Sequence, residues 1–271
     1  MTTEFDNLPH WWGSFTFPYE QGLQWRIGPL TLIVCHRNGE WHLGHQRAEN
    51  FEDPDITWEV CRTEELPETL DNHSRYIFSK AVKELLVTPR LADRPVISRP
   101  RVPFNLTAGE EVTLYVSSPL WLELALALGA SPPIKLEEVS IQRPSDTWFG
   151  PSTLEGELCY ASATHCRIHL DELPQRAHRA ITPVLIRNQA DTTLTVERLN
   201  LPAPLLSLYV CAEGQLWTPR VTLIRGRDED MAELKIDDKP PEEINSPRLL
   251  GAPRQTAHVG ALIRAFNAVF S

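Results

Sequence analysis

The chain of 271 residues is 42% hydrophobic and 23% charged, an ordinary balance for a folded protein with a sizeable core. Its formal net charge of −10 supplies no basic field of the kind that nucleic-acid-binding proteins use, so we expect no nucleic-acid partner. The five cysteines are odd in number and far apart, and the N-terminus lacks the basic start and apolar run of a signal peptide, so we expect free thiols and a cytoplasmic location.

Alternating apolar residues and tight turns indicate a β protein. Between Gln24 and Arg47, the residues Leu30, Leu32 and Val34 alternate with other side chains ahead of the dipeptide Asn38-Gly39. Asn-Gly between two alternating runs predicts a two-residue β-hairpin, because both residues tolerate a positive φ angle. Similar runs recur along the chain among 23 prolines, which favours many short strands joined by tight loops.

Three histidines lie in or beside this hairpin, His36, His42 and His45, and Cys35 precedes the first of them. Imidazole and thiolate groups bind zinc, so a metal site is one interpretation. Successive side chains of a strand point to opposite faces, however, so His42 and His45 should diverge. We therefore assign no metal site to this group.

Further along the chain, the stretch from Pro95 to Pro103 contains three prolines and reads as an extended connection between two β units. The run from Trp121 to Leu128 places a leucine at every second position, which predicts a strand with one buried face. A short helix is the alternative, because Leu and Ala favour helices. The most apolar stretch, Pro119 to Ala130, contains Glu123 and is too short to span a membrane.

The tail differs in composition from everything before it. The segment from Arg227 to Gln255 is polar, acidic and proline-rich, and it reads as a linker. Beyond it, apolar residues recur at helical spacing: Val259, Leu262, Ile263, Phe266, Val269 and Phe270. This spacing predicts an amphipathic helix of about three to four turns, which needs a surface on which to bury its apolar stripe. Its own core, a second copy or another protein can supply that surface.

These observations predict an all-β fold of antiparallel, sandwich-like units with a C-terminal amphipathic helix. We expect an N-terminal β unit at residues 1–94 and a second β unit at residues 95–227. An acidic, proline-rich linker and the helix would follow at residues 228–271.

The sequence patterns of the easily recognised enzymes are missing, including the phosphate-binding glycine loop, G-x-S-x-G, C-x-x-C and H-E-x-x-H. We expect no cofactor. One group could still support catalysis, because Asp146, Glu155 and Glu157 lie close in sequence to Trp148 and Phe149. Paired carboxylates beside an aromatic side chain are the groups that glycoside hydrolysis uses. The two aromatic residues are also candidates for binding.

A second group contains the residue types that bind zinc: Cys159, His165, Cys166 and His169. Their spacing lacks the close pairs of a zinc knuckle or ribbon, and free cysteines are common in protein cores. We therefore predict no metal site, and these four residues are the candidates if there is one.

Four segments together carry a resemblance to a known family: Ala92–Ile97 (ADRPVI), Ser118–Trp121 (SPLW), Pro144–Gly150 (PSDTWFG) and Glu155–Tyr160 (EGELCY). They resemble the uncharacterised prokaryotic family catalogued as domain of unknown function 432, over roughly Leu23 to Arg225. The resemblance implies an all-β fold and brings no activity or catalytic residue. It also suggests an association with genes beside small mechanosensitive-type channels, and hence an accessory role in a membrane process.

The leading hypothesis is a non-catalytic binding or accessory protein that contacts a membrane channel or another protein, or a second copy of itself, through its C-terminal helix. Its candidate binding residues are Trp148, Phe149, Leu262, Ile263, Phe266 and Phe270. The alternative is an enzyme that acts on a carbohydrate or another polar small molecule with the carboxylates named above.

Overall fold

The structure is a computed structural model that describes residues 8–17, 20–37, 39–49, 58–65, 67–78, 82–150, 154–162, 165–226, 231–256 and 262–266. The all-β prediction is confirmed. Helical residues in this described part of the chain are confined to short 3-10 turns: η1 (Pro67–Thr69), η2 (Leu170–Glu172) and η3 (Ala203–Leu205). None of these turns has the length and apolar character that crossing a bilayer requires.

The chain forms two compact units that interleave along the sequence. The first unit contains residues 1–90, 120–143 and 176–178. The second contains residues 91–119, 144–175 and 179–271.

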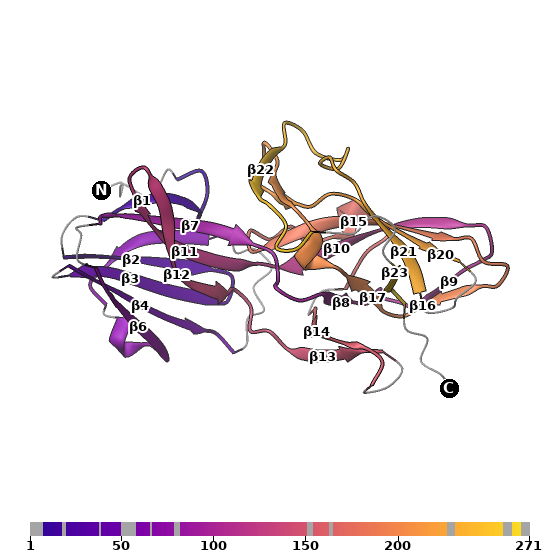
Figure 1. Cartoon of the computed structure of the whole chain (residues 1–271), viewed down its shortest axis with the longest axis horizontal. Coiled ribbons are helices and arrows are strands. Elements are labelled where there is room, and N and C mark those ends of the chain that lie inside the picture. Colours follow the sequence, from indigo (N-terminus) through magenta and orange to yellow (C-terminus); the bar gives the residue numbers. More distant parts are fainter. Residues whose placement is uncertain are drawn as a thin grey trace. The chain divides into compact units, whose positions relative to one another are not determined.

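Two antiparallel sheets build the first unit (Figure 1). One has the strand order β5-β2-β3-β4-β6, and the other has the order β1-β7-β11-β12. The strands are β1 (Gly13–Thr16), β2 (Gln21–Ile27), β3 (Leu30–Arg37), β4 (Glu40–Arg47), β5 (Trp58–Thr63), β6 (Asn72–Ile77), β7 (Glu84–Arg90), β11 (Trp121–Leu128) and β12 (Ser131–Ser140).

Aromatic side chains fill the space between these two sheets. Trp25 on β2 is fully buried and meets Phe15 on β1 edge-on, with their ring centroids 5.0 Å apart. Phe17 meets Trp41 on β4 in the same manner at 4.9 Å. The Trp25 indole donates a hydrogen bond of 3.1 Å to the backbone oxygen of Trp11, so the polar atom of this buried side chain is satisfied.

The predicted hairpin is confirmed in β3 and β4. Arg37 pairs with Glu40 across the turn, and Gly39 has a φ angle of 79°, which the hairpin turn requires. Alternation along β4 buries Trp41 in the core and turns His42 to the outer face of the sheet, whereas His45 lies inward. His42 and His45 therefore diverge, as the strand pattern predicts.

The second unit contains mixed sheets, which corrects the expectation of purely antiparallel ones. β15 runs parallel to both β19 and β20, and β14 runs parallel to β8. The strands are β8 (Val96–Ser98), β9 (Phe104–Leu106), β10 (Glu111–Pro119), β13 (Asp146–Phe149), β14 (Glu157–Ala161), β15 (Arg179–Asn188), β16 (Leu194–Val196), β17 (Leu199–Leu201), β18 (Leu208–Val210), β19 (Leu216–Trp217), β20 (Val221–Arg225), β21 (Met231–Ile236), β22 (Arg248–Gly251) and β23 (Leu262–Arg264).

The strand β15 organises the largest sheet of this unit. It pairs with β10 from Arg179 to Arg187, and on its other side it pairs first with β19 and then with β20. Pro183, which has no N–H to donate, falls in the gap between those two partners. In the same gap, the buried hydroxyls of Thr218 and Thr182 bond to each other at 2.7 Å. The backbone N–H of Thr218 also donates a hydrogen bond of 3.0 Å to the carbonyl oxygen of Ile181, so contacts continue across the interruption.

Two smaller sheets complete the second unit. One has the strand order β13-β14-β8-β17, and β9 pairs with β16 in the other. In the first of these, β13 is the terminal strand, and Figure 1 shows it at the margin of the sheet.

The prediction of a C-terminal helix is wrong. Leu262, Ile263 and Arg264 form strand β23, which pairs antiparallel with β21. Phe266 is 1% exposed and bridges to Leu199, so it belongs to the core of the second unit. The preceding segment, which the sequence suggests is a linker, contributes β21 and β22 to the large sheet. The other residues of the expected helix stripe, Val259, Val269 and Phe270, lie outside the described residues.

The reason for this error is that a short apolar run fits a helix and a buried strand equally well. Tertiary pairing decides between them. An edge of β21 is available to the tail, and Ala232 and Leu234 on that strand are buried. An isolated short helix is only marginally stable in water, whereas pairing with β21 gives the backbone of this segment hydrogen-bond partners in a sheet.

We expect Phe266→Ala to destabilise the protein by about 3–5 kcal/mol, because it removes a buried aromatic side chain and leaves a cavity. The free energy of unfolding in urea measures this loss. Leu249→Ala is the matched control, since Leu249 is 55% exposed, and it should change stability by less than about 0.5 kcal/mol. An unchanged free energy of unfolding in Phe266→Ala would contradict the placement of Phe266 in the core.

Candidate functional site

The three candidate catalytic carboxylates lie in and around the hairpin formed by β13 and β14. In the strand register, Asp146 pairs with Tyr160, and Phe149 pairs with Glu157. Alternation then places Asp146 and Glu157 on opposite faces of the hairpin. Glu155 is exposed in the connection between the strands. The structure thus does not bring Asp146 and Glu157 together across one pocket.

Each of those two strand carboxylates has a different partner. Asp146 accepts a hydrogen bond of 3.1 Å from Arg94, and 63% of its side chain is exposed, so this ion pair adds little stability. Glu157 accepts a hydrogen bond of 2.5 Å from the side-chain amide of Asn200 on β17. These contacts assign both carboxylates to holding the hairpin against its surroundings.

The neighbouring aromatic residues Trp148 and Phe149 point to opposite sides. Phe149 is fully buried and packs with Ile97 and Cys159 in a small core cluster. Trp148 remains 41% exposed on the other face. Of these two candidate binding residues, Phe149 therefore anchors the hairpin and Trp148 is partly exposed at the surface.

Two glycines give this hairpin its close packing. A Cβ atom at Gly156 would lie 2.7 Å from the indole nitrogen of Trp148, so only glycine at position 156 leaves room for the indole. A Cβ atom at Gly150 would collide with the backbone oxygen of Glu155. The backbone at Gly150 and Gly156 is thus closely packed beside the exposed aromatic ring.

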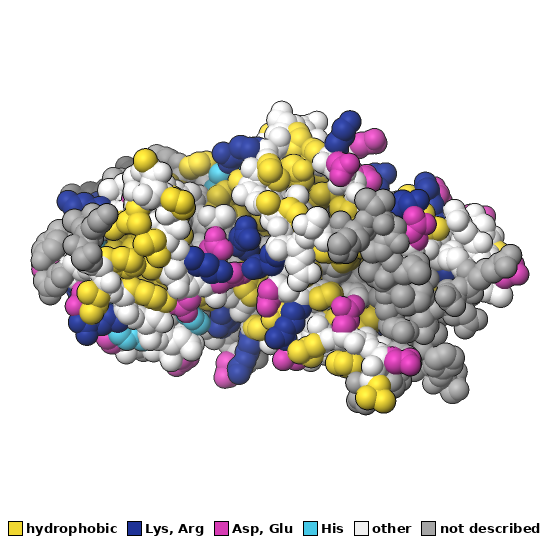
Figure 2. Space-filling model, viewed as in Figure 1, with side chains coloured by type: hydrophobic (Ala, Val, Ile, Leu, Met, Phe, Trp, Pro, Cys, Tyr) yellow, Lys and Arg dark blue, Asp and Glu magenta, His cyan; other side chains and the backbone are white. Residues whose placement is uncertain are grey.

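Exposed apolar side chains gather on the same hairpin. Trp148 pairs across the strands with Leu158, which is 43% exposed, and Leu154 in the connection is 94% exposed. Figure 2 shows hydrophobic side chains along the margin where β13 and β14 lie. We call Trp148, Leu154 and Leu158 the hairpin patch.

A polar group borders the hairpin patch on its own face. Tyr160, which follows Leu158 by two residues, donates a hydrogen bond of 3.1 Å to Asp93. The Arg94 guanidinium lies 5.2 Å from the centre of the Tyr160 ring, within range of a cation–π interaction. Burial, together with the charge of Asp93, raises the pKa of Tyr160, so its hydroxyl keeps its proton and remains a donor.

The four candidate metal ligands of the second unit differ in their burial. Cys159 and Cys166 are buried, whereas His165 and His169 are exposed. Burial raises the pKa of the Cys159 thiol to about 12 and that of Cys166 to about 11, which disfavours the thiolate that binds metal. The structure does not gather these residues into a set of three donors.

We expect Cys159 and Cys166 to resist alkylation by iodoacetamide at pH 8 in the folded protein. Their raised pKa values leave almost no thiolate at that pH, and the side chains are buried. In denaturant, both should react readily, because an unperturbed thiol has a pKa of about 8.5. Peptide mass spectrometry after timed quenching measures both rates. Rapid labelling of either residue in the folded state would contradict this account.

The candidate binding residues of the tail do not form a helix in the described residues. Leu262 and Ile263 belong to β23, and Phe266 is buried. Phe270 lies outside the described residues. The tail therefore contributes to the core of the second unit, and the helical docking element that the sequence suggests is absent from the described residues.

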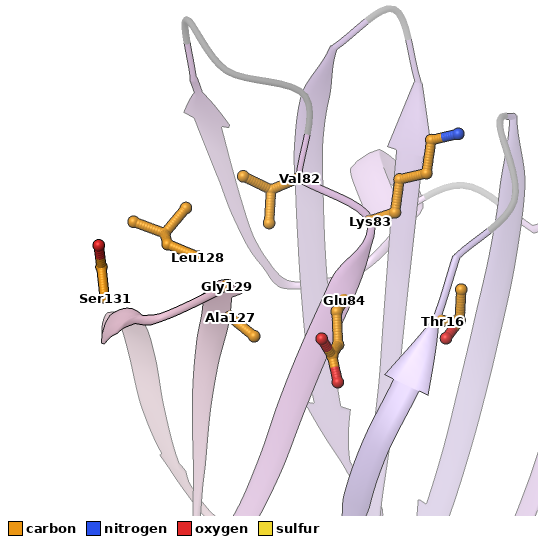
Figure 3. Close-up of a pocket in the computed structure, with 8 residues that line it drawn as sticks. All are labelled: Thr16, Val82, Lys83, Glu84, Ala127, Leu128, Gly129 and Ser131. Carbon is orange, nitrogen blue, oxygen red and sulfur yellow. The ribbon is translucent and has the colours of Figure 1, made fainter.

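A pocket of about 510 Å³ opens in the first unit at the ends of β1, β7 and β11 (Figure 3). Its lining contains one carboxylate, Glu84, which already accepts a hydrogen bond from the Ser14 hydroxyl. Figure 3 shows the Lys83 side chain extending away from the other lining residues. Because few polar groups converge on this space, we assign no small-molecule ligand to it.

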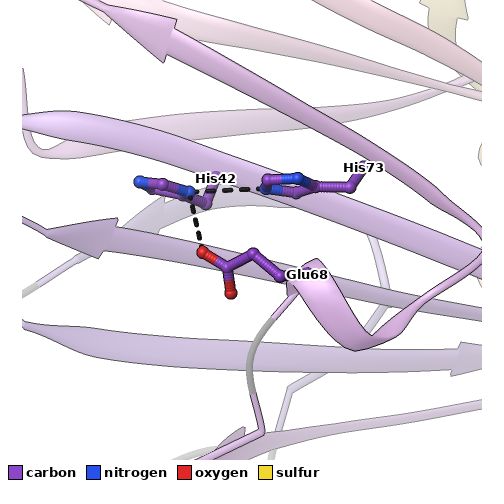
Figure 4. Close-up of side chains that lie close together, drawn as sticks. All are labelled: His42, Glu68 and His73. Carbon is purple, nitrogen blue, oxygen red and sulfur yellow. Dashed lines mark hydrogen bonds and ion pairs between the residues drawn. The ribbon is translucent and has the colours of Figure 1, made fainter.

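A different cluster, on the outer face of the five-stranded sheet, brings three possible metal ligands together (Figure 4). They are His42 on β4, Glu68 on η1 and His73 on β6. Sequence reasoning considered His42 but missed Glu68 and His73, because they come from other elements. The available signal was the pairing of β4 with β6, which local patterns do not reveal.

Comparison with known proteins supports the resemblance seen in the sequence. Residues 11–271 match the family model described as "Protein of unknown function (DUF432)". The match includes the tail, which corrects the narrower extent from Leu23 to Arg225. No match is found among the curated proteins or among the solved structures.

Proposed function

The chain belongs to the DUF432 family, and since the description of that family names no function, we propose one from the geometry: a non-catalytic binding protein. The proposed recognition surface is the hairpin patch together with the outer edge of β13, the terminal strand of its sheet in the described residues. The proposed partner is an extended apolar segment of another protein.

The observation that carries this proposal is the clustering of exposed apolar side chains. Trp148, Leu154 and Leu158 lie on one hairpin and are between 41% and 94% exposed. The other exposed large apolar residues of the described chain lie outside this hairpin: Ile77, Val102, Ile134, Ile168 and Leu249. Single apolar residues on a surface are ordinary, whereas grouped ones are typical of an interaction site.

The hairpin is also preorganised for binding. Phe149 fixes one face of it in the core, and the Tyr160 hydroxyl fixes its far end to Asp93. Gly156 allows the Trp148 indole to rest against the backbone. A surface that is already ordered loses little conformational freedom on binding, so more of the contact energy appears as affinity.

The edge position of β13 suggests how a partner would be held. As the terminal strand of its sheet, β13 offers backbone groups to an added strand. Alternate residues of that partner strand would then contact Trp148, while the ion pair between Asp146 and Arg94 would border one end. An aromatic residue near the centre of such a contact is the residue type that most often dominates its energy.

This proposal moves the contact surface from the tail to the hairpin, because Leu262–Arg264 pair with β21 as a strand. A membrane channel, which the family resemblance suggests, remains one candidate partner. The enzyme alternative has no specific observation in its favour, since Asp146 and Glu157 face opposite sides of the hairpin.

Site-specific photo-crosslinking tests the proposal. A photoreactive amino acid replaces Leu158 in the full-length protein, which is irradiated in the host cell. A matched protein carries the same group at Leu249, an exposed apolar residue on β22. We expect a discrete protein adduct from position 158 that Trp148→Ala abolishes, and no such adduct from position 249.

Once that adduct is identified, Trp148→Ala should weaken binding of the purified partner about 30-fold or more, as expected for an aromatic hot spot. Isothermal titration calorimetry measures this change. Equal adducts from positions 158 and 249, or unchanged affinity for the Trp148→Ala protein, would refute the hairpin as the recognition surface. If the adduct consists of two copies of this chain and sedimentation analysis shows a dimer, the hairpin is a self-association surface and the proposed partner is wrong.

A further inference from the structure

The cluster of His42, Glu68 and His73 follows from strand alternation and one close backbone approach. β4 turns His42 to the outer face of its sheet, and the register pairs Gly44 with His73 on that same face. A Cβ atom at Gly44 would lie 2.5 Å from the backbone oxygen of Pro67, so only glycine lets η1 pack here. This packing places Glu68 over the two histidines.

The distances between the donor atoms match those around a bound metal ion. His42 Nδ1 lies 3.4 Å from His73 Nε2 and 3.3 Å from Glu68 Oε1. All three donor atoms lie within 4.8 Å of one another. In a tetrahedral zinc site with bonds of about 2.0–2.1 Å, neighbouring ligand atoms are about 3.3 Å apart. The cluster therefore needs little rearrangement to surround an ion.

A second carboxylate orients His42. Glu40 Oε2 lies 3.4 Å from His42 Nε2, and Arg75 holds Glu40 through hydrogen bonds of 2.6 and 2.5 Å. Glu40 can accept a proton held on Nε2, and in that tautomer the Nδ1 lone pair is directed at Glu68 and His73. Metal-binding histidines commonly have such a carboxylate partner.

Three electron-pair donors that converge in this way favour a cation between them. Arg75 does not serve that role, because its guanidinium is engaged by Glu40. Two imidazoles and one carboxylate suit Zn²⁺ and related transition ions, whereas Mg²⁺ and Ca²⁺ prefer oxygen ligands alone. Glu68 and His73 are exposed, so a further coordination position would be open to water.

We propose that His42, Glu68 and His73 form a Zn²⁺-binding site with at least one coordination position open to solvent. This inference is independent of the hairpin patch, because its residues come from β4, η1 and β6 in the first unit.

Zinc titration of the untagged, full-length protein after removal of bound metal tests the site. Calorimetry with a competing chelator should give one tight Zn²⁺ per chain. His73→Ala and Glu68→Gln each remove a ligand and should reduce the Zn²⁺ affinity by more than about 100-fold. Glu40→Gln removes only the carboxylate that orients His42 and should reduce the affinity by about 10-fold. His169→Ala, which removes an exposed histidine of the second unit, should leave it unchanged.

Cobalt substitution gives a second measurement that a loss of stability would not mimic. The Co²⁺-loaded protein should show the visible absorption of a four- or five-coordinate nitrogen and oxygen site, and His73→Ala should remove that absorption. Circular dichroism checks that the variants are folded, which we expect because both replaced ligands are exposed. Absence of tight Zn²⁺ binding, unchanged affinity in folded His73→Ala, or loss of affinity in His169→Ala would overturn the proposal.

Discussion

The alternation of side chains along a pleated strand is the constraint on which the rest of this structure depends. On β4 it buries Trp41 and turns His42 outward. On β13 it buries Phe149 and exposes Trp148. Adjacent residues therefore serve the core and the surface, and each candidate site is fixed by the same packing that stabilises its sheet. A shift of one residue in register would exchange the two roles, so the hydrophobic core specifies the surface chemistry as well.

Both surface features also depend on a residue that lacks a side chain. Gly44 allows η1 to approach the sheet closely enough to bring Glu68 beside His42. Gly156 leaves room for the indole of Trp148. In each case, the absence of a side chain on the glycine lets neighbouring groups pack closely against the backbone. Close packing of this kind suits a surface that must hold a geometry.

Local pattern was enough to predict the all-β class, the hairpin of β3 and β4, and the strand β11, because each depends on residues close together in sequence. The tail was mispredicted because Leu262, Ile263 and Phe266 fit a helical stripe, and only the distant strand β21 decides their conformation. Glu68 and His73 escaped prediction for a similar reason, since long-range pairing brings them to His42. Asp146 and Glu157 are close in sequence, but the register that separates them is not visible in composition or spacing.

The pairing of β23 with β21 has a consequence for protein synthesis. The large sheet of the second unit includes β10, which begins at Glu111, and it is completed only by Leu262–Arg264. On the ribosome, β21 emerges well before β23, and at about 5–20 residues per second the delay is on the order of seconds. During that time the edge of β21 exposes backbone donors and acceptors that can pair with a neighbouring nascent chain. The pairing of β23 therefore acts as a closing step, because it covers the edge of β21.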